Sequence, residues 1–133
     1  MDISKVSKVL NIPCNDKTFF RWWFELLKPV HHLTDRESDV IAAFVKKRYE
    51  LSQSITDTKL LDEVLMQEKY KKEVREEAGV SAAFFQVIMG KLRQNKVIKD
   101  GKINPLYLPP LKGNKVVCLT FALKMNGAEG SNK

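Results

Sequence analysis

The sequence predicts a mainly α-helical fold that ends in a small antiparallel β-sheet, and three observations support this. Apolar residues recur at three- and four-residue spacing through most of the first 94 positions, which is the period of an amphipathic helix. Thr34 to Glu37 has the T-x-x-E pattern of a capping box, a strong helix start. After Gln94 the pattern changes to short strands around Asp100-Gly101, a dipeptide that favours a tight hairpin turn.

The composition limits the classes of protein to consider. A chain of 133 residues is about the size of one domain. Its net charge of +7 favours an acidic partner, either nucleic acid or an acidic protein face, although a basic excess also simply aids solubility. Cys14 and Cys118 lack the spacing of a metal or redox motif and indicate a reducing compartment. We find no apolar run of membrane-spanning length and no signal-peptide core, so we expect no membrane partner.

Residues 1–30 are expected to form an N-terminal helical segment. A short helix is predicted before Pro13 and a longer one from position 15 or 16 to Lys28, where Pro29 ends it. The short helix would present on one side Val6, Val9 and Leu10. A break at residues 29–32 would then lead into the main domain.

The longer N-terminal helix is apolar almost all round. Neighbouring residues of a helix point about 100° apart, so its many aromatic rings cannot all face one core. One interpretation places most of these rings in the core. The other assigns the surplus to a protein interface, where Trp and Phe are enriched. The residues that we assign to such an interface are Phe20, Trp22, Trp23 and Phe24.

Residues 31–124 are expected to form the main domain, which begins with the capped helix. Three basic residues at positions 46–48 suit the C-terminal end of that helix. A shorter helix is predicted after Thr56 or Asp57, followed by a charged, solvated helix from Gln67 to Ala78. The inward stripe of the first helix is Val40, Ile41, Phe44 and Val45.

The next segment has the pattern of a helix-turn-helix. Gly79 suits the left-handed residue that ends one helix, and Ser81 suits the cap of the next, which is predicted to reach Gln94. A hairpin over residues 96–103 would follow as a wing. The predicted fold is therefore a winged helix-turn-helix, and the second helix would bury Phe85, Ile88, Met89 and Leu92.

The C-terminal part has one more predicted element. Residues 116–123 are rich in β-formers and are expected to form a strand. This strand could pair with the wing of its own chain or, after Pro109-Pro110, with the sheet of a neighbouring subunit. Residues 125–133 have nothing to bury and are expected to form a flexible tail.

The outward face of the second helix of the motif is poor in groups that can recognise bases. Base-edge contacts need donors and acceptors from residues such as Arg, Lys, Asn or Gln, and only Gln86 provides them here. We therefore expect this helix to pack on protein. Besides Gln86, its outward face would contain Ala82, Ala83, Val87 and Gly90.

A run of basic residues follows that face. Between Lys91 and Lys124 Asp100 is the one acid, so these cations could contact the phosphates of duplex DNA without selecting a sequence. The alternative function is thus a DNA-binding regulator or a packaging accessory; a simple solvated face is the remaining interpretation. For that alternative the DNA-binding residues are Gln86, Lys91, Arg93, Lys96, Lys99 and Lys102.

The sequence gives no sign of catalysis or of a cofactor. It contains neither a phosphate-binding glycine loop nor a nucleophile with a partner base and acid. The adjacent His31 and His32 have no third ligand at metal-site spacing. We therefore expect a non-enzymatic protein with no metal and no cofactor.

Two blocks of the sequence resemble a family. FFRWWFELLKPVHHLTDRESDVIAAFVKKRYEL and VREEAGVSAAFFQVIMGKLRQNKVIKDGKINPLY, within about residues 15–110, are similar to the small winged-helix-like virion structural proteins of crAss-like bacteriophages. The resemblance implies a ring or adaptor protein of the head-to-tail connector. It further implies a homo-oligomeric ring that contacts the portal or a neighbouring ring. The expected location is the virion, assembled in the host cytoplasm; for a regulator it is the cytoplasm.

Overall fold

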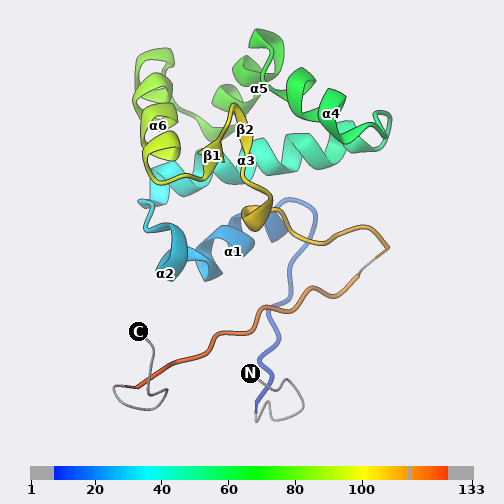
Figure 1. Cartoon of the computed structure of the whole chain (residues 1–133), viewed down its shortest axis with the longest axis vertical. Helices are drawn as coiled ribbons and strands as arrows, with labels where there is room; N and C mark the ends of the chain where they lie inside the picture. The colour runs from blue at the N-terminus through cyan, green and yellow to red at the C-terminus, as the bar shows by residue number, and fades with distance from the viewer. Residues whose placement is uncertain (1–7, 114, 126–133) are drawn as a thin grey trace. The chain divides into compact units, whose positions relative to one another are not determined.

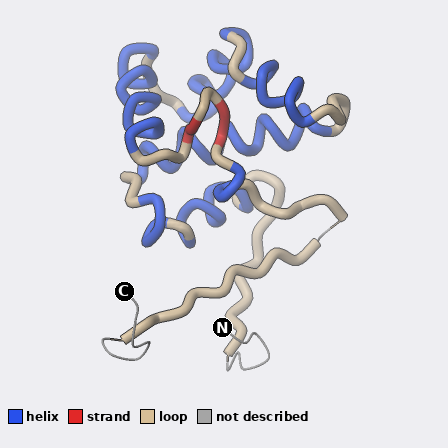
Figure 2. Tube along the Cα trace, viewed as in Figure 1, coloured by secondary structure: helices blue, strands red, loops and turns tan. Residues whose placement is uncertain are grey.

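The computed structural model describes residues 8–113 and 115–125 of the chain. This part is mainly helical with a two-stranded antiparallel sheet, as Figures 1 and 2 show. It divides into two units, Pro13–Pro109 and a second unit that includes residues 8–12 and 110–125. In order, the elements of the first unit are α1 (Phe19–Leu26), α2 (Lys28–His31), α3 (Asp35–Ser52), α4 (Thr58–Leu65), α5 (Glu68–Ala78), α6 (Ala82–Gln94), β1 (Ile98–Lys99), β2 (Lys102–Ile103) and a 3-10 helix, η2 (Pro105–Tyr107).

Helix α3 is the centre of the first unit. The predicted capping box is confirmed: the Thr34 hydroxyl accepts from the Glu37 amide at 3.3 Å, and the Glu37 carboxylate accepts from the Thr34 amide at 2.9 Å. Every residue from Val40 to Val45 is buried. Figure 1 shows why, because α1 lies on one side of α3 and α4, α5 and α6 lie on the other.

The basic residues of α3 differ from their predicted role. The helix continues to Ser52, so positions 46–48 lie more than a turn before its end and do not act as C-terminal charges. They instead bind acids of the next two helices, including two on α5 that we expected to be solvated. The pairs are Arg48 with Asp62 (2.9 Å), Lys47 with Glu73 (2.9 Å) and Lys46 with Glu77 (3.3 Å).

The aromatic helix is more deeply buried than expected. Phe20, Trp23 and Phe24 belong to the core, which corrects their assignment to a surface, whereas Trp22 is 42% exposed. The burial depends on a segment that is distant in sequence: the Trp23 indole N–H donates to the carbonyl of Tyr107 at 2.9 Å. With α3 on one side and η2 on another, Phe20, Trp23 and Phe24 are all covered although their rings point in different directions.

His31 joins several parts of this unit. The predicted break at residues 29–32 is mostly the short helix α2, and His31 ends it in a buried position. The backbone amide of Leu33 donates to His31 Nδ1 at 2.9 Å, so Nε2 carries the proton and donates to the Phe24 carbonyl at 2.7 Å. Asn95 at the end of α6 donates to the His31 carbonyl at 2.9 Å. The neutral imidazole thus connects α1 to the start of α3.

Two expected elements outside this unit are not formed. Residues 8–12 are not helical, because so short a helix is not stable unless an apolar face packs against the rest of the protein. Val6, which was expected on that face, lies outside the described residues. Residues 116–123 form no strand, and the sheet of the described residues contains only β1 and β2.

In the first unit β1 lies beside α6 and β2 beside α4, so helices flank this short ladder. Most of the predicted tail, residues 126–133, lies outside the described part.

His31 gives a pH-dependent prediction for stability. Burial lowers its pKa from the ordinary 6.5, so the unfolded chain takes up a proton at a pH where the folded chain does not. The contribution of the neutral His31 to the free energy of unfolding is therefore complete above about pH 6.5. As the pH falls below that value this contribution is lost, by at most ~1.4 kcal/mol per pH unit. Urea unfolding at about pH 7.5 and about pH 5.5, where carboxylates stay ionised, measures this loss.

The two histidines provide matched variants for that measurement. His32→Gln changes the exposed neighbour and should keep the pH dependence of the parent chain. His31→Gln should be less stable at both values but should lack the loss between them. An unchanged pH dependence in His31→Gln would contradict the role given to the buried imidazole.

Candidate interface on α6 and the hairpin

The turn between α5 and α6 sets the direction of α6. Gly79 has a φ of 72°, as its position predicts, and the Val80 amide donates back to the Arg75 carbonyl at 3.2 Å. The Ser81 hydroxyl accepts from the Phe84 amide at 3.1 Å and caps α6, which confirms the second local prediction. The helix therefore begins at a fixed point after the turn.

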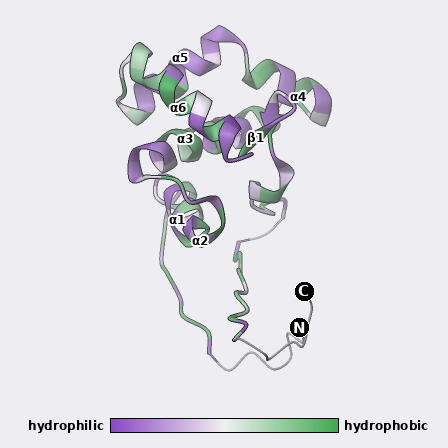
Figure 3. Ribbon diagram, turned by 60° about the vertical axis from the view of Figure 1, so that its left-hand side comes forward, coloured by the Kyte–Doolittle hydropathy of each residue, from purple (hydrophilic) through white to green (hydrophobic). Residues whose placement is uncertain are grey.

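The inner side of α6 is buried in the core. The predicted stripe is confirmed, because all four of its residues are buried, and the Phe85 ring lies 5.9 Å from that of Phe44 on α3. Because one side is fixed against α3, the opposite side must face away from the core. In Figure 3 hydrophobic residues colour much of α6.

The outer side of α6 is exposed and largely apolar. Val87 is 67% exposed and Phe84 is 42% exposed. Phe84 was missed at the sequence level, although the 100° step from the buried Phe85 would have placed it on another side of the helix. Gln86 is the one residue here with an amide side chain. We call this surface the α6 face; it consists of Ala82, Ala83, Phe84, Gln86, Val87 and Gly90.

The hairpin that follows has the predicted turn. Asp100 and Gly101 have φ values of 56° and 76°, as a two-residue primed turn requires. Ile98 pairs with Ile103 and both are buried. Lys99 pairs with Lys102, and both are exposed, so two like charges stand directly opposite each other.

Ion pairing is unevenly distributed along the chain. Every ion pair formed among the described residues lies between Arg21 and Glu77. The predicted basic residues after this region have no acidic partner in the described part of the chain, and all but the half-buried Lys91 are exposed. We call them the basic cluster; it consists of Lys91, Arg93, Lys96, Lys99 and Lys102.

A second apolar surface lies on α1 and α2. Trp22 is the only one of the four predicted aromatic interface residues that is exposed. Leu26 and Val30 follow it at four-residue intervals and are also exposed, which the sequence did not single out. We call these three residues the α1–α2 stripe.

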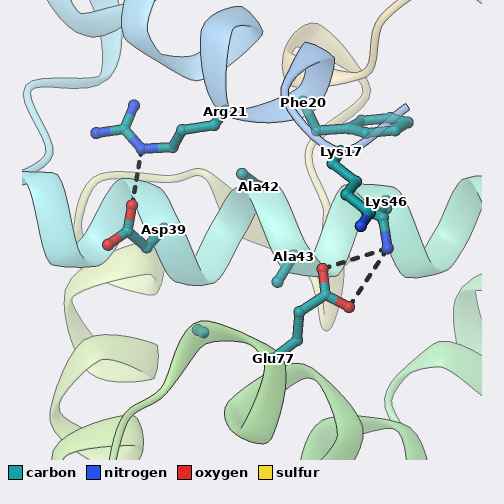
Figure 4. Close-up of a pocket in the computed structure, with 9 residues that line it drawn as sticks. Lys17, Phe20, Arg21, Asp39, Ala42, Ala43, Lys46 and Glu77 are labelled. Carbon is teal, nitrogen blue, oxygen red and sulfur yellow. Dashed lines mark hydrogen bonds and ion pairs between the residues drawn. The ribbon is translucent and has the colours of Figure 1, made fainter. Parts of the chain in front are cut away.

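The hollow drawn in Figure 4 lies among α1, α3 and α5. Small side chains at Ala42 and Ala43 leave room for it. Four of its charged groups are already paired: Arg21 Nε lies 2.8 Å from Asp39, and Lys46 lies 3.3 Å from Glu77. A ligand would have to displace an ion pair to bind there, so we do not take the hollow as the functional site.

The described residues also lack a metal-binding cluster and a membrane-spanning helix. No three His, Cys, Asp or Glu side chains gather there as a metal site would require. Within residues 8–113 and 115–125, no helix combines the length and the apolar character that a membrane span requires. Comparison of the chain with protein-family models, curated proteins and solved structures found no match. The α6 face, the α1–α2 stripe and the basic cluster are therefore the candidate functional surfaces of the described residues.

Two glycines test the local geometry of the turn and of α6. Gly79→Ala should lower the unfolding free energy by about 1 kcal/mol, because its left-handed backbone disfavours a Cβ although there is space for one. Gly90→Ala, in the middle of α6 with equally open surroundings, should raise it by about 0.5–1 kcal/mol. Urea denaturation measures both changes. Changes of the same sign would contradict this assignment of backbone strain.

Proposed function

We propose that the chain is a non-enzymatic assembly protein built on a winged helix-turn-helix scaffold. The order of elements supports the scaffold. Helices α5 and α6 are joined through Gly79 as the two helices of such a motif, α3 packs against both, and the hairpin of β1 and β2 follows where a wing would be. Within this proposal α6 occupies the place of a recognition helix.

The composition of the α6 face is the observation that most supports assembly with another protein. A helix that selects bases presents several donors and acceptors to the major groove. This face presents mainly methyl groups and one ring, and Gln86 is its single amide. Exposed aromatic and aliphatic groups beside a charged rim are the composition of protein interfaces. Packing on a protein surface would bury Phe84 and Val87, which the chain's own core leaves exposed.

Two separate apolar surfaces support a ring. In a closed ring each subunit uses one surface toward one neighbour and a different surface toward the other. The α6 face and the α1–α2 stripe lie on different helices of one unit, so each subunit has two apolar surfaces to offer. The sequence resemblance gives this ring its proposed setting: a ring or adaptor in the head-to-tail connector of a phage virion, stacked against the portal or another ring.

Residues 115–125 supply a third element suited to assembly. They form no hydrogen bond, ion pair or ring contact in the described part of the chain, and their apolar side chains are mostly exposed, Leu123 by 94%. A segment rich in β-formers that is left unpaired is suited to adding to a neighbour. Of the two partners that the sequence left open for this segment, we propose the sheet of a neighbouring subunit.

Self-association tests the assembly function. Light scattering over a range of concentrations should show oligomers of the parent chain, and Val87→Glu should shift their midpoint at least about tenfold to higher concentration, the equivalent of ~1.4 kcal/mol. Leu60→Glu on α4 is the matched control, since Leu60 is also exposed but lies outside both surfaces; it should have no effect. A parent chain that stays monomeric, or equal effects of the two variants, would argue against the proposal.

Purified virions test the proposed setting. A connector ring is present in a fixed number of copies per particle, so quantitative mass spectrometry of virions should give a constant ratio of this chain to the portal. Cross-linking within the particle should join the α6 face to another copy or to a ring neighbour. Presence of the chain in infected cells but not in particles would overturn the connector assignment while leaving self-association intact.

A further inference from the structure

We propose that the basic cluster binds the phosphate backbone of duplex DNA without selecting its sequence. The inference does not depend on the assembly function, because it uses different residues. Charge compensation differs between parts of the chain. The basic side chains Arg21, Lys46, Lys47 and Arg48 have acidic partners on α1, α3, α4 or α5.

The members of the basic cluster have no such compensation. They lie on the last turns of α6, on the connection to β1 and on the hairpin, with Asp100 as the single acid between residues 91 and 102. Lysines 99 and 102 are held opposite each other by the strand register, although like charges in that position disfavour the pairing. A bound anion would relieve this repulsion.

The local backbone fixes how the hairpin follows α6. Lys96 has a φ of 60°, a left-handed conformation that is unusual for a lysine. Lys96 follows the C-cap of α6: its amide donates to the Arg93 carbonyl at 3.1 Å, and the Val97 amide donates to the Leu92 carbonyl at 2.9 Å. The side-chain amide of Asn104 also donates to the Lys96 carbonyl at 2.9 Å, and its backbone amide donates to the Val97 carbonyl at 2.8 Å. These bonds fix the start of the hairpin relative to the end of α6, so the cations on both sides of it have defined positions.

Three features select duplex DNA among anionic partners. The cations are spread over the end of α6, the connection after it and the hairpin, so they match a row of phosphates better than one compact anion. Lysine and arginine contacts to phosphates give affinity without base selection. The adjoining α6 face has almost no group for base edges, so binding should not depend on sequence.

Fluorescence anisotropy with two unrelated 20-base-pair duplexes tests the proposal. The parent chain should bind both within about threefold of each other, with affinity falling steeply as salt rises, by about 0.9 log unit per log unit of salt for each phosphate contact. The double variant Lys99→Gln/Lys102→Gln should reduce the steepness of that slope by about one to two log units of affinity per log unit of salt. It should also weaken binding at low salt about tenfold. Both side chains are exposed, so circular dichroism should show an intact fold.

The matched control removes the same charge elsewhere. Lys59→Gln/Lys72→Gln alters two exposed lysines on α4 and α5 and should leave the slope unchanged. Equal losses in both double variants would show that only net charge matters and would overturn the proposal. So would an absence of binding at low salt, or a preference for one duplex by orders of magnitude, which would indicate a regulator.

Two further measurements distinguish DNA binding from binding to an acidic protein and from self-association. Polyglutamate should compete poorly; competition equal to that of DNA would assign the cluster to an acidic protein partner and overturn the proposal. Val87→Glu should bind DNA like the parent chain, since it leaves the cluster intact. Failure of DNA binding and failure of self-association are therefore seen in different variants and different measurements.

Discussion

Six consecutive residues of α3, from Val40 to Val45, are buried, and successive residues of a helix point about 100° apart, so this helix needs neighbours on every side. No single partner can meet that need. The chain meets it with α1 on one side and α4, α5 and α6 on the other. Because α6 contributes its apolar stripe to this cover, its remaining side has no place in the core. The exposed α6 face is thus a consequence of how α3 is covered.

The features predicted correctly from the sequence are those whose chemistry is local. The capping box at Thr34, the left-handed Gly79, the cap at Ser81 and the Asp100-Gly101 turn each depend on a few adjacent residues, and all are present. The aromatic helix was harder because its burial depends on Tyr107, which is more than eighty residues from Trp23 and carries no sign of that contact in the sequence. Composition alone could not say which rings would be covered.

The candidate surfaces were predictable to different degrees. The apolar character of the α6 face follows from helical spacing, and Phe84 could have been found by the same step. The basic cluster was visible as a run of charge, but its lack of partners was not, since the lysines of α3 looked similar and are paired with distant acids. The α1–α2 stripe could not be predicted, because its continuation to Val30 depends on α2 forming where Pro29 suggested a break.

The hydrogen bonds around His31 have a geometric consequence for a ring. Asn95 ties the end of α6 to the α2 carbonyl, while the imidazole ties α2 to α1 and to the start of α3. The two apolar surfaces are therefore joined by a short series of polar contacts instead of a loose linker. In a head-to-tail ring the angle between the two contact surfaces of one subunit determines how many subunits close the circle. The buried imidazole would then help to set the circumference of the assembly.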